Sequence, residues 1–106
     1  MKKVYIASPY TIGDQEENVK FQMRVGALLM DHGFAPFIPL LYHYQDKLHP
    51  RPYDKWLEID FAWILSCDCL LRLGGESKGA DMEVEFAKEN NIPVYYSVEE
   101  VVKNES

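Results

Sequence analysis

Short apolar runs and amphipathic segments alternate along the chain. The first apolar run, Val4–Ala7, is halted by Ser8 and Pro9, which is typical of a short buried strand. Further apolar runs predict three more strands, at Phe34–Leu41, Cys69–Leu73 and Ile92–Tyr96. Helical spacing of apolar positions predicts four helices, at Glu16–Asp31, Tyr53–Ser66, Ala80–Asn90 and Val98–Lys103. This alternation indicates an α/β fold, an open parallel sheet of about four strands with helices on both faces. We expect one flavodoxin-like or Rossmann-like domain over residues 1–106.

The pattern also predicts details of the first half of the chain. We expect the first helix to bury the stripe formed by Val19, Met23, Ala27 and Met30. Gly33 is expected to end that helix. Two prolines, Pro36 and Pro39, favour an edge position for the second strand, and residues 42–52 are predicted to form a loop.

The carboxyl ends of the predicted strands mark where a ligand would bind. An open parallel sheet binds its ligands beyond these ends. In this chain they are followed by Ser8-Pro9-Tyr10, the loop after Leu41, the turn Gly74–Gly79, and Ser97.

Two carboxylates interrupt the apolar faces of the predicted helices. The neighbours of Glu83 three and four positions away are small or apolar: Gly79, Ala80, Phe86 and Ala87. The neighbours of Asp60 at the same spacings are large and apolar: Trp56, Leu57, Trp63 and Ile64. Burial of an unpaired carboxylate is costly, so each needs a partner or a function. A catalytic pair with two different pKa values is one interpretation. The alternative is structural, with each carboxylate capping a neighbouring helix or pairing with Arg24, Arg51 or Arg72.

The turn Gly74–Gly79 is rich in glycine and precedes a helix, whose N-terminus offers free N–H groups. Ser77 is placed to cap that helix or to donate its hydroxyl to a phosphate. The turn matches neither the GxGxxG nor the P-loop pattern, which leaves a dinucleotide or nucleoside triphosphate site without support.

The segment 42–52 carries two histidines, His43 and His49, without the cysteine or carboxylate spacing of a metal site. We therefore expect no metal. Three tyrosines around this segment are suited either to stack on a base or to cover a dimer surface, and the sequence does not separate these roles: Tyr42, Tyr44 and Tyr53.

Composition narrows the range of partners. The net charge of −6 makes binding to DNA or RNA polymers unfavourable. The N-terminal apolar run is too short for a signal peptide, and no run approaches the length of a membrane span. Cys67 and Cys69 are separated by one residue, a poor geometry for a disulfide within one strand, so both are expected to be reduced. We expect a cytoplasmic protein that binds neither membranes nor nucleic acid polymers.

Several of these residues together resemble one enzyme family. The matching segments are Tyr5-Ile6-Ala7-Ser8-Pro9, Asp60, Asp68 and the run from Gly79 to Ala87. With them the chain resembles the nucleoside 2-deoxyribosyltransferase superfamily, from the first strand to the last. The resemblance implies that Glu83 is the nucleophile, that Asp60 lies near the scissile bond, and that Tyr5 lies near the nucleophile.

The resemblance also implies a substrate. Ser77, six residues before Glu83, corresponds to a phosphate-binding serine of the nucleoside 5′-monophosphate N-glycosidase branch. Cleavage or transfer at the N-glycosidic bond of a nucleoside or nucleoside 5′-monophosphate is therefore expected, without a cofactor and in a homo-oligomer. The catalytic residues would be Glu83, Asp60 and Tyr5. The residues expected to bind the substrate are Ser8, Pro9, Tyr10, Asp68, Gly75, Ser77 and Gly79.

Two alternatives to an enzyme stay open. Glu85 stands where the family usually has glycine, which favours a module that binds a nucleotide without turning it over. The other is a homo-oligomeric scaffold in which Asp60 and Glu83 only pair with each other.

Overall fold

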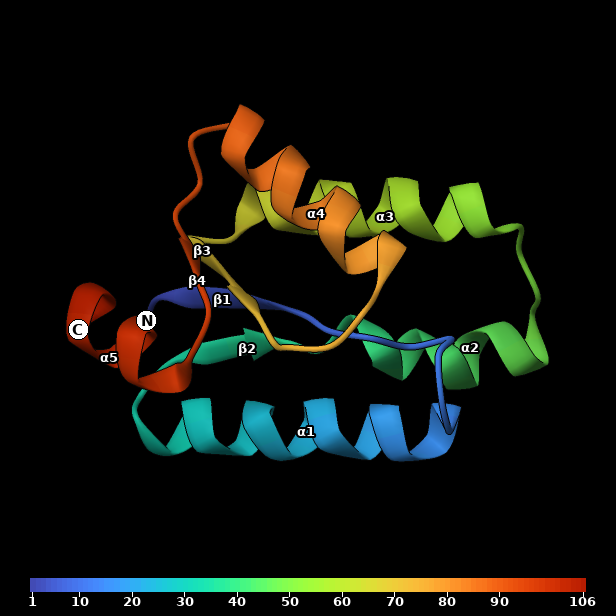
Figure 1. Ribbon diagram of the computed structural model, residues 1–106, viewed down its shortest axis with the longest axis horizontal. Coiled ribbons are helices and arrows are strands. Elements are labelled where there is room, and N and C mark those ends of the chain that lie inside the picture. Colours follow the sequence, from blue (N-terminus) through green and yellow to red (C-terminus); the bar gives the residue numbers. More distant parts are fainter.

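Four parallel strands form the sheet at the centre of the protein (Figure 1). The computed structural model describes residues 1–106. The strands are β1 (Lys3–Ala7), β2 (Ala35–Phe37), β3 (Cys69–Arg72) and β4 (Val94–Tyr95). Their order is β2-β1-β3-β4, and every neighbouring pair is parallel. The predicted fold class is confirmed.

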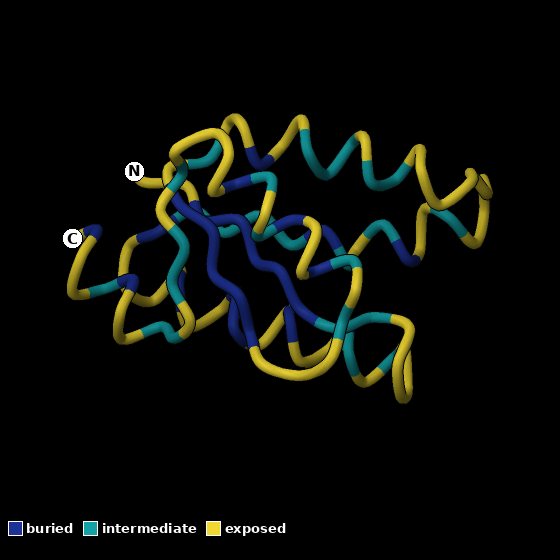
Figure 2. Tube along the Cα trace, turned by 45° about the horizontal axis from the view of Figure 1, so that its top comes forward, coloured by how far each residue is buried: buried dark blue, intermediate teal, exposed yellow.

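Helices cover both faces of this sheet (Figure 1). One face carries α1 (Gln15–Asp31) and α5 (Val98–Glu105), and the other carries α3 (Tyr53–Ser66) and α4 (Lys78–Glu89). A short 3₁₀ turn, η1 (Pro39–Leu41), and the helix α2 (Tyr42–Leu48) follow β2. Figure 2 shows the two central strands, β1 and β3, as buried and the edge strands β2 and β4 as partly buried, with exposed residues on the outer sides of the helices.

The alternation of side chains along β1 divides the core into two clusters. Val4 and Ile6 pack with Leu29 and Val101 on the side of α1 and α5. Tyr5 and Ala7 instead belong to the cluster on the side of α3 and α4. Since successive side chains of a strand point to opposite faces, Tyr5 is directed at α4.

The buried face of α1 is not the predicted stripe. Of the four predicted residues only Val19 is buried, and Met23 and Met30 are exposed. The residues actually buried are Val19, Gln22, Val25, Gly26 and Leu29. A hydrophobic pattern misses Gly26, where the helix packs so closely on β2's continuation that an added Cβ would lie 2.6 Å from Ile38 Cδ1. It also misses Gln22, because this buried side chain is polar and a hydrophobic pattern counts only apolar residues.

Gln22 is fully buried because all its polar atoms are bonded. Its Nε2 donates to Ser8 Oγ at 2.8 Å and to the Ile6 carbonyl at 3.2 Å. Its Oε1 accepts from the Leu40 backbone N–H at 3.0 Å. This side chain therefore joins the end of β1 to η1, two segments that border the pocket described below.

The predictions of the second strand and of the loop that follows it are only partly confirmed. The strand ends at Phe37 rather than Leu41, because Pro39 begins the 3₁₀ turn with its fixed backbone angle and without an N–H for a ladder. Residues 42–48, predicted as loop, form α2, in which His43 is the buried residue.

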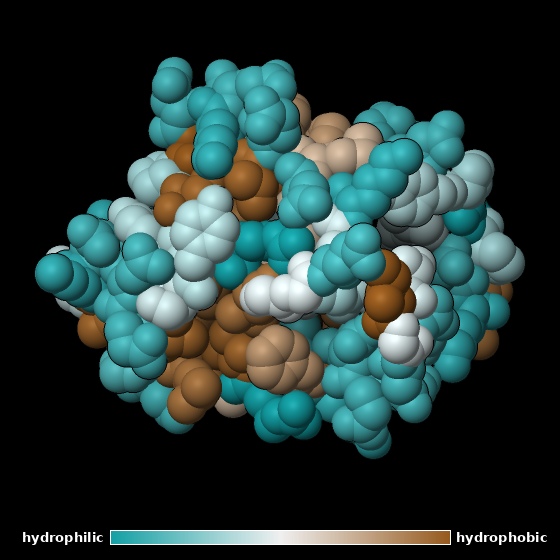
Figure 3. Space-filling view, in the orientation of Figure 1, coloured by the Kyte–Doolittle hydropathy of each residue, from teal (hydrophilic) through white to brown (hydrophobic).

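The exterior is largely hydrophilic on the face seen in Figure 1, with apolar side chains in separate patches (Figure 3). None of the helices combines the length and the apolar character needed to cross a membrane.

Candidate active site

A pocket of about 280 Å³ lies where the carboxyl ends of the strands meet α2, α3 and α4. Eighteen residues line it, from the segment after β1, from η1 and α2, from α3, and from the start of α4. Six of the ten predicted site residues are among them: Ser8, Tyr10, Asp60, Ser77, Gly79 and Glu83. This is the sheet edge at which a ligand was expected.

Glu83 enters the pocket from α4 and is held from below by Tyr5. The residue is only 7% exposed, and the Tyr5 hydroxyl donates a hydrogen bond to Glu83 Oε2 at 2.5 Å. Tyr5 itself is fully buried in β1 and does not line the pocket. The hydroxyl therefore fixes one carboxylate oxygen of Glu83 without touching a ligand.

Asp60 lies beside Glu83, one helix away on α3. Its Oδ1 is buried and has no hydrogen-bond partner. Burial, above all, raises the pKa of Asp60 to about 7. Burial, and then the charge of Asp60, raise the pKa of Glu83 to about 8, against the opposing effect of the Tyr5 hydrogen bond. Two such carboxyls side by side retain a proton near neutral pH, and they titrate as one pair.

No arginine pairs with either carboxyl. Arg72, the buried arginine nearest in sequence to α4, donates to Asp81 Oδ1 at 3.0 Å and to the Gly75 carbonyl at 2.9 Å. The ion pairs of the chain leave out Asp60 and Glu83 altogether. The structure thus does not support arginine pairing, one of the two structural alternatives for these carboxyls.

The start of α4 forms another wall of the pocket. Ser77 Oγ accepts a hydrogen bond from the Ala80 N–H at 3.1 Å, so the predicted helix cap is confirmed. Gly79 follows, and an added Cβ there would lie 3.1 Å from the Tyr53 hydroxyl. Lys78 also lines the pocket and belongs to no ion pair.

The opposite wall is built by residues for which the sequence indicated no role in the site. His43 and Asp46 come from α2, and Trp56 and Leu57 come from α3 one turn before Asp60. Trp56 Nε1 donates to Asp46 Oδ1 at 2.6 Å, which ties the two helices together. The apolar spacing of the second predicted helix included Trp56 but indicated only a core position. The loop after Leu41 was expected at the ligand-binding edge, and Tyr42 and Tyr53, two of the tyrosines suited to stack on a base, line the pocket.

Four predicted residues lie outside the pocket lining: Tyr5, Pro9, Asp68 and Gly75. Pro9 and Gly75 lie against each other, and Tyr5 bonds to Glu83 from within the core. Asp68 is the one that the structure does not bring near the pocket. It is exposed just before β3 and accepts from the Lys3 N–H at 2.8 Å, at the opposite end of the sheet from the carboxyl ends.

Replacing Gly75 by alanine is expected to destabilise the protein by about 1–3 kcal/mol. Gly75 has φ +110°, and an added Cβ would lie 2.9 Å from Pro9 Cγ. Gly74→Ala is the matched control, because an added Cβ there has nothing within 4 Å. The measurement is urea unfolding of both variants. Equal stability of the two would show that the contact with Pro9 and the backbone conformation carry no cost.

The side chains of the pocket offer no metal site. No group of three or more His, Cys, Asp and Glu residues is placed to hold a metal ion. Both cysteines are free, and burial raises the pKa of each thiol, so neither is an activated nucleophile.

The sequence matches a family model over residues 2–97, described as a domain of unknown function, DUF7768. The chain belongs to the DUF7768 family. No curated protein matches the sequence significantly.

Two solved structures share the fold of this DUF7768 chain. One is the 2-deoxyribosyltransferase of the psychrotolerant bacterium Bacillus psychrosaccharolyticus, with 20% identity, a TM-score of 0.63, and coverage of 87% of this chain and 69% of that one. The other is the 2-deoxyribosyltransferase of Leishmania mexicana, with 20% identity, a TM-score of 0.65, and coverage of 89% of this chain and 62% of that one. The chain therefore spans less than two thirds of the Leishmania protein. At this identity the similarity shows the fold, and it is the fold that the sequence resemblance implied.

Proposed function

We propose that the pocket binds a nucleoside or a nucleoside 5′-monophosphate and that the protein cleaves or transfers its N-glycosidic bond. The observation that carries this proposal is the carboxyl pair of Glu83, which is buried, and Asp60, whose Oδ1 is buried; both line the pocket, and neither has an arginine partner. Placing two carboxyls side by side without a cationic partner opposes folding, so a chemical role explains their presence better than a structural one. The fold shared with two 2-deoxyribosyltransferases supports the same class of reaction.

In the first step, a carboxylate oxygen of Glu83 attacks the anomeric carbon of the sugar. The new C–O bond forms as the C–N bond breaks, and the electron pair of the C–N bond leaves with the base. The pair shares one proton, and the reactive form is the one in which Glu83 is the carboxylate and Asp60 holds the proton, which it delivers to the departing base. Tyr5 holds the Glu83 carboxylate in place through its hydroxyl.

In the second step, the glycosyl group leaves Glu83. Asp60, now a carboxylate, takes a proton from a water molecule or from an acceptor base, which attacks the anomeric carbon and frees Glu83. Water gives hydrolysis, and a base gives transfer. The reaction needs no cofactor, because both proton transfer and covalent attachment are carried out by the two carboxyls.

The start of α4 is suited to the 5′ end of the substrate. Ser77 Oγ accepts from Ala80, which leaves its own O–H free to donate to a ligand. Lys78 adds a positive charge with no acidic partner, and the N-terminus of α4 favours an anion. These groups together favour a 5′-phosphate over a free 5′-hydroxyl.

The main argument for a module that only binds a nucleotide was that Glu85 crowds the site. Glu85 is exposed on α4 and does not line the pocket, so it does not crowd the site. The homo-oligomer stays a prediction, and exposed apolar side chains on α3, such as Trp63 and Leu65, are consistent with it.

The test is chromatographic detection of free base from a panel of ribo- and deoxyribonucleosides and their 5′-monophosphates, each with and without an acceptor base. Release from monophosphates without acceptor is the expected result. Release only with an acceptor would assign a transferase. Absence of release from every member, in a protein that binds them, would contradict the proposed function.

A further inference from the structure

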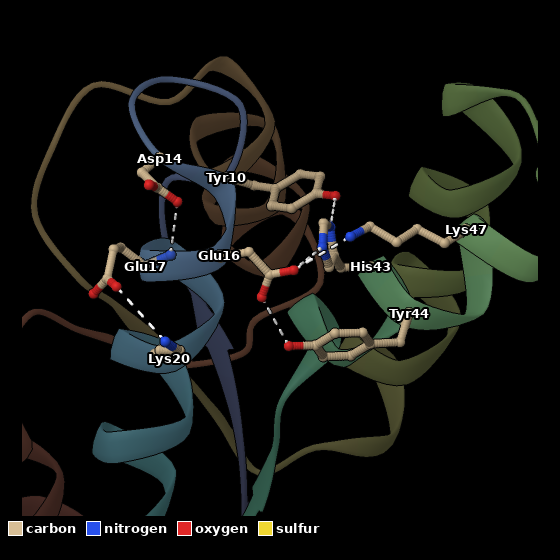
Figure 4. Close-up of polar contacts among 8 residues, drawn as sticks. All are labelled: Tyr10, Asp14, Glu16, Glu17, Lys20, His43, Tyr44 and Lys47. Atoms are coloured by element: carbon tan, nitrogen blue, oxygen red, sulfur yellow. Dashed lines mark hydrogen bonds and ion pairs between the residues drawn. The ribbon is translucent and has the colours of Figure 1, made fainter.

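A second polar cluster borders the pocket at the end away from α4, and the proposed reaction does not use it. Tyr10 lies in the segment after β1, Glu16 near the start of α1, and His43 on α2 (Figure 4). Tyr10 and His43 line the pocket, whereas Glu16 does not. The side chain of His43 is only 4% exposed, so its two ring nitrogens are committed to these two neighbours.

The direction of the hydrogen bonds follows from Glu16. Its carboxylate is contacted by His43 Nε2 at 3.1 Å, the Tyr44 hydroxyl at 3.0 Å and Lys47 Nζ at 3.2 Å (Figure 4). The hydrogen bonds from these three groups, His43 first, hold the pKa of Glu16 down at about 2. Glu16 is therefore a carboxylate that only accepts, and His43 Nε2 must carry the hydrogen.

The protonation of His43 determines whether the Tyr10 hydroxyl donates or accepts. In a neutral imidazole with its hydrogen on Nε2, Nδ1 is an acceptor. The Tyr10 hydroxyl is hydrogen-bonded to Nδ1 of His43, and with His43 in this neutral form Tyr10 donates its hydrogen there. The lone pairs of the Tyr10 oxygen are left for the pocket. Tyr10 thus offers a ligand an acceptor and no donor.

Asp46 gives the same end of the pocket a second acceptor. Its Oδ1 accepts from Trp56 Nε1 at 2.6 Å and from the Arg51 N–H at 2.9 Å. The bond from the Arg51 backbone and then the bond from Trp56 lower the pKa of Asp46, which keeps it ionised. Its charge is close enough to Tyr10 to raise the pKa of that hydroxyl, after the larger effect of burial.

The pocket runs along α3 from the carboxyl pair to this cluster. Asp60 and Trp56 are one helical turn apart, and Trp56 bonds to Asp46. With the anomeric carbon at Glu83 and the 5′ end at Ser77, the base is the part of a nucleoside that extends toward Trp56 and Asp46. Trp56 and Leu57 supply an apolar wall for its ring.

We propose that Tyr10 and Asp46 recognise the exocyclic amino group of the base, and that His43 and Glu16 are positioning residues that hold Tyr10 as an acceptor. This inference rests on the proposed function. An amino group presents two N–H donors to the acceptors at this end. A carbonyl in its place would bring its lone pairs against the lone pairs of these two acceptors, and no hydrogen bond would form. The substrate class is therefore a nucleoside or nucleotide of adenine or cytosine, in preference to hypoxanthine or uracil.

The test compares ligands that differ only in this group: 2′-deoxyadenosine with 2′-deoxyinosine, and 2′-deoxycytidine with 2′-deoxyuridine, as 5′-monophosphates. Calorimetric Kd values and kcat/KM for base release are measured for each pair. We expect the wild type to prefer the amino member of a pair by about tenfold or more. Tyr10→Phe is expected to reduce this preference to about twofold or less, because it removes the acceptor oxygen and keeps the ring.

Three further variants separate positioning from folding. His43→Leu is expected to lose most of the preference, since Tyr10 can then turn its hydrogen into the pocket. His43→Asn supplies an acceptor to Tyr10 again and is expected to recover part of it. Tyr96→Phe removes an exposed hydroxyl outside the pocket and is expected to leave both the preference and the rates unchanged. Melting temperatures of all variants confirm that each is folded.

The outcomes distinguish this inference from the proposed function. A preference in Kd that Tyr10→Phe removes, in a protein that releases no base, would support amino-group recognition and contradict the reaction. Base release with equal values for amino and oxo ligands, or a preference that Tyr10→Phe leaves intact, would overturn the inference and leave the reaction standing. No binding of any of these ligands would overturn both.

Discussion

Replacing Glu83 by glutamine is expected to lower base release by on the order of 10³-fold or more while nucleotide binding is retained. Glutamine has nearly the shape of glutamate, and its amide oxygen can still accept the hydrogen bond from the Tyr5 hydroxyl. The amide is not a nucleophile toward the anomeric carbon, so no glycosyl-enzyme forms. The measurement pairs the chromatographic assay for free base with calorimetric titration of the same nucleotide.

Glu85→Gln is the matched control, because it makes the same substitution two residues further along α4 on the exposed face. It is expected to release base at the wild-type rate. Wild-type release by the Glu83→Gln variant would show that Glu83 is not the nucleophile. Loss of both release and binding would show that Glu83 holds the ligand rather than attacks it.

The position of Glu83 could be predicted from helical spacing alone. Its neighbours at three and four positions are small or apolar, whereas those of Glu85 are mostly charged. The structure agrees, with Glu83 buried and Glu85 exposed. Local patterns of this kind succeed where one helix face decides the environment. The alternation of strands and helices determines the parallel sheet in the same way.

The opposite wall of the pocket depends on contacts that no local pattern contains. His43 is buried because Tyr10 and Glu16, 33 and 27 positions away in the sequence, provide partners for its two ring nitrogens. The sequence showed only a histidine in a polar, proline-rich segment. The buried face of α1 was mispredicted for a related reason, since Gln22 is buried through bonds to Ser8 and Leu40 that a hydropathy pattern cannot register.

Residues assigned to the site only by resemblance to the family were not all placed near the pocket. Tyr5 was assigned by resemblance only, and the structure places its hydroxyl on Glu83. Asp68 was assigned in the same way, yet it lies before β3 at the far end of the sheet, where it bonds to the Lys3 N–H. A residue assigned by resemblance therefore belongs to the pocket only if the fold also places it near the carboxyl ends of the strands.

The contribution of Glu83 to the stability of the protein is expected to fall as pH rises from about 4 to 8, and Glu83→Gln is expected to remove this contribution. The pKa of Glu83 is raised from 4.5 to about 8, chiefly by burial. Below the unfolded value both states hold the proton, and Glu83 makes no difference. Between the two values the unfolded chain releases the proton while the folded chain keeps it. The unfolded state is then favoured increasingly, until the folded state also ionises near pH 8.

The difference in unfolding free energy between Glu83→Gln and the wild type should therefore be near zero at pH 4. At pH 8 it should favour the variant by on the order of 3 kcal/mol, with part of the effect shared with Asp60. Urea unfolding at pH 4, 6 and 8 measures it, and Glu85→Gln is expected to follow the wild type. Parallel curves for Glu83→Gln and wild type would contradict the raised pKa. A carboxylate retained for stability has a lowered pKa, and it strengthens the fold as pH rises. The predicted slope is the opposite one: the contribution of Glu83 to stability falls with rising pH, because the ionised Glu83 weakens the fold. A group that weakens the fold in the ionised form needed for attack is retained for its chemistry.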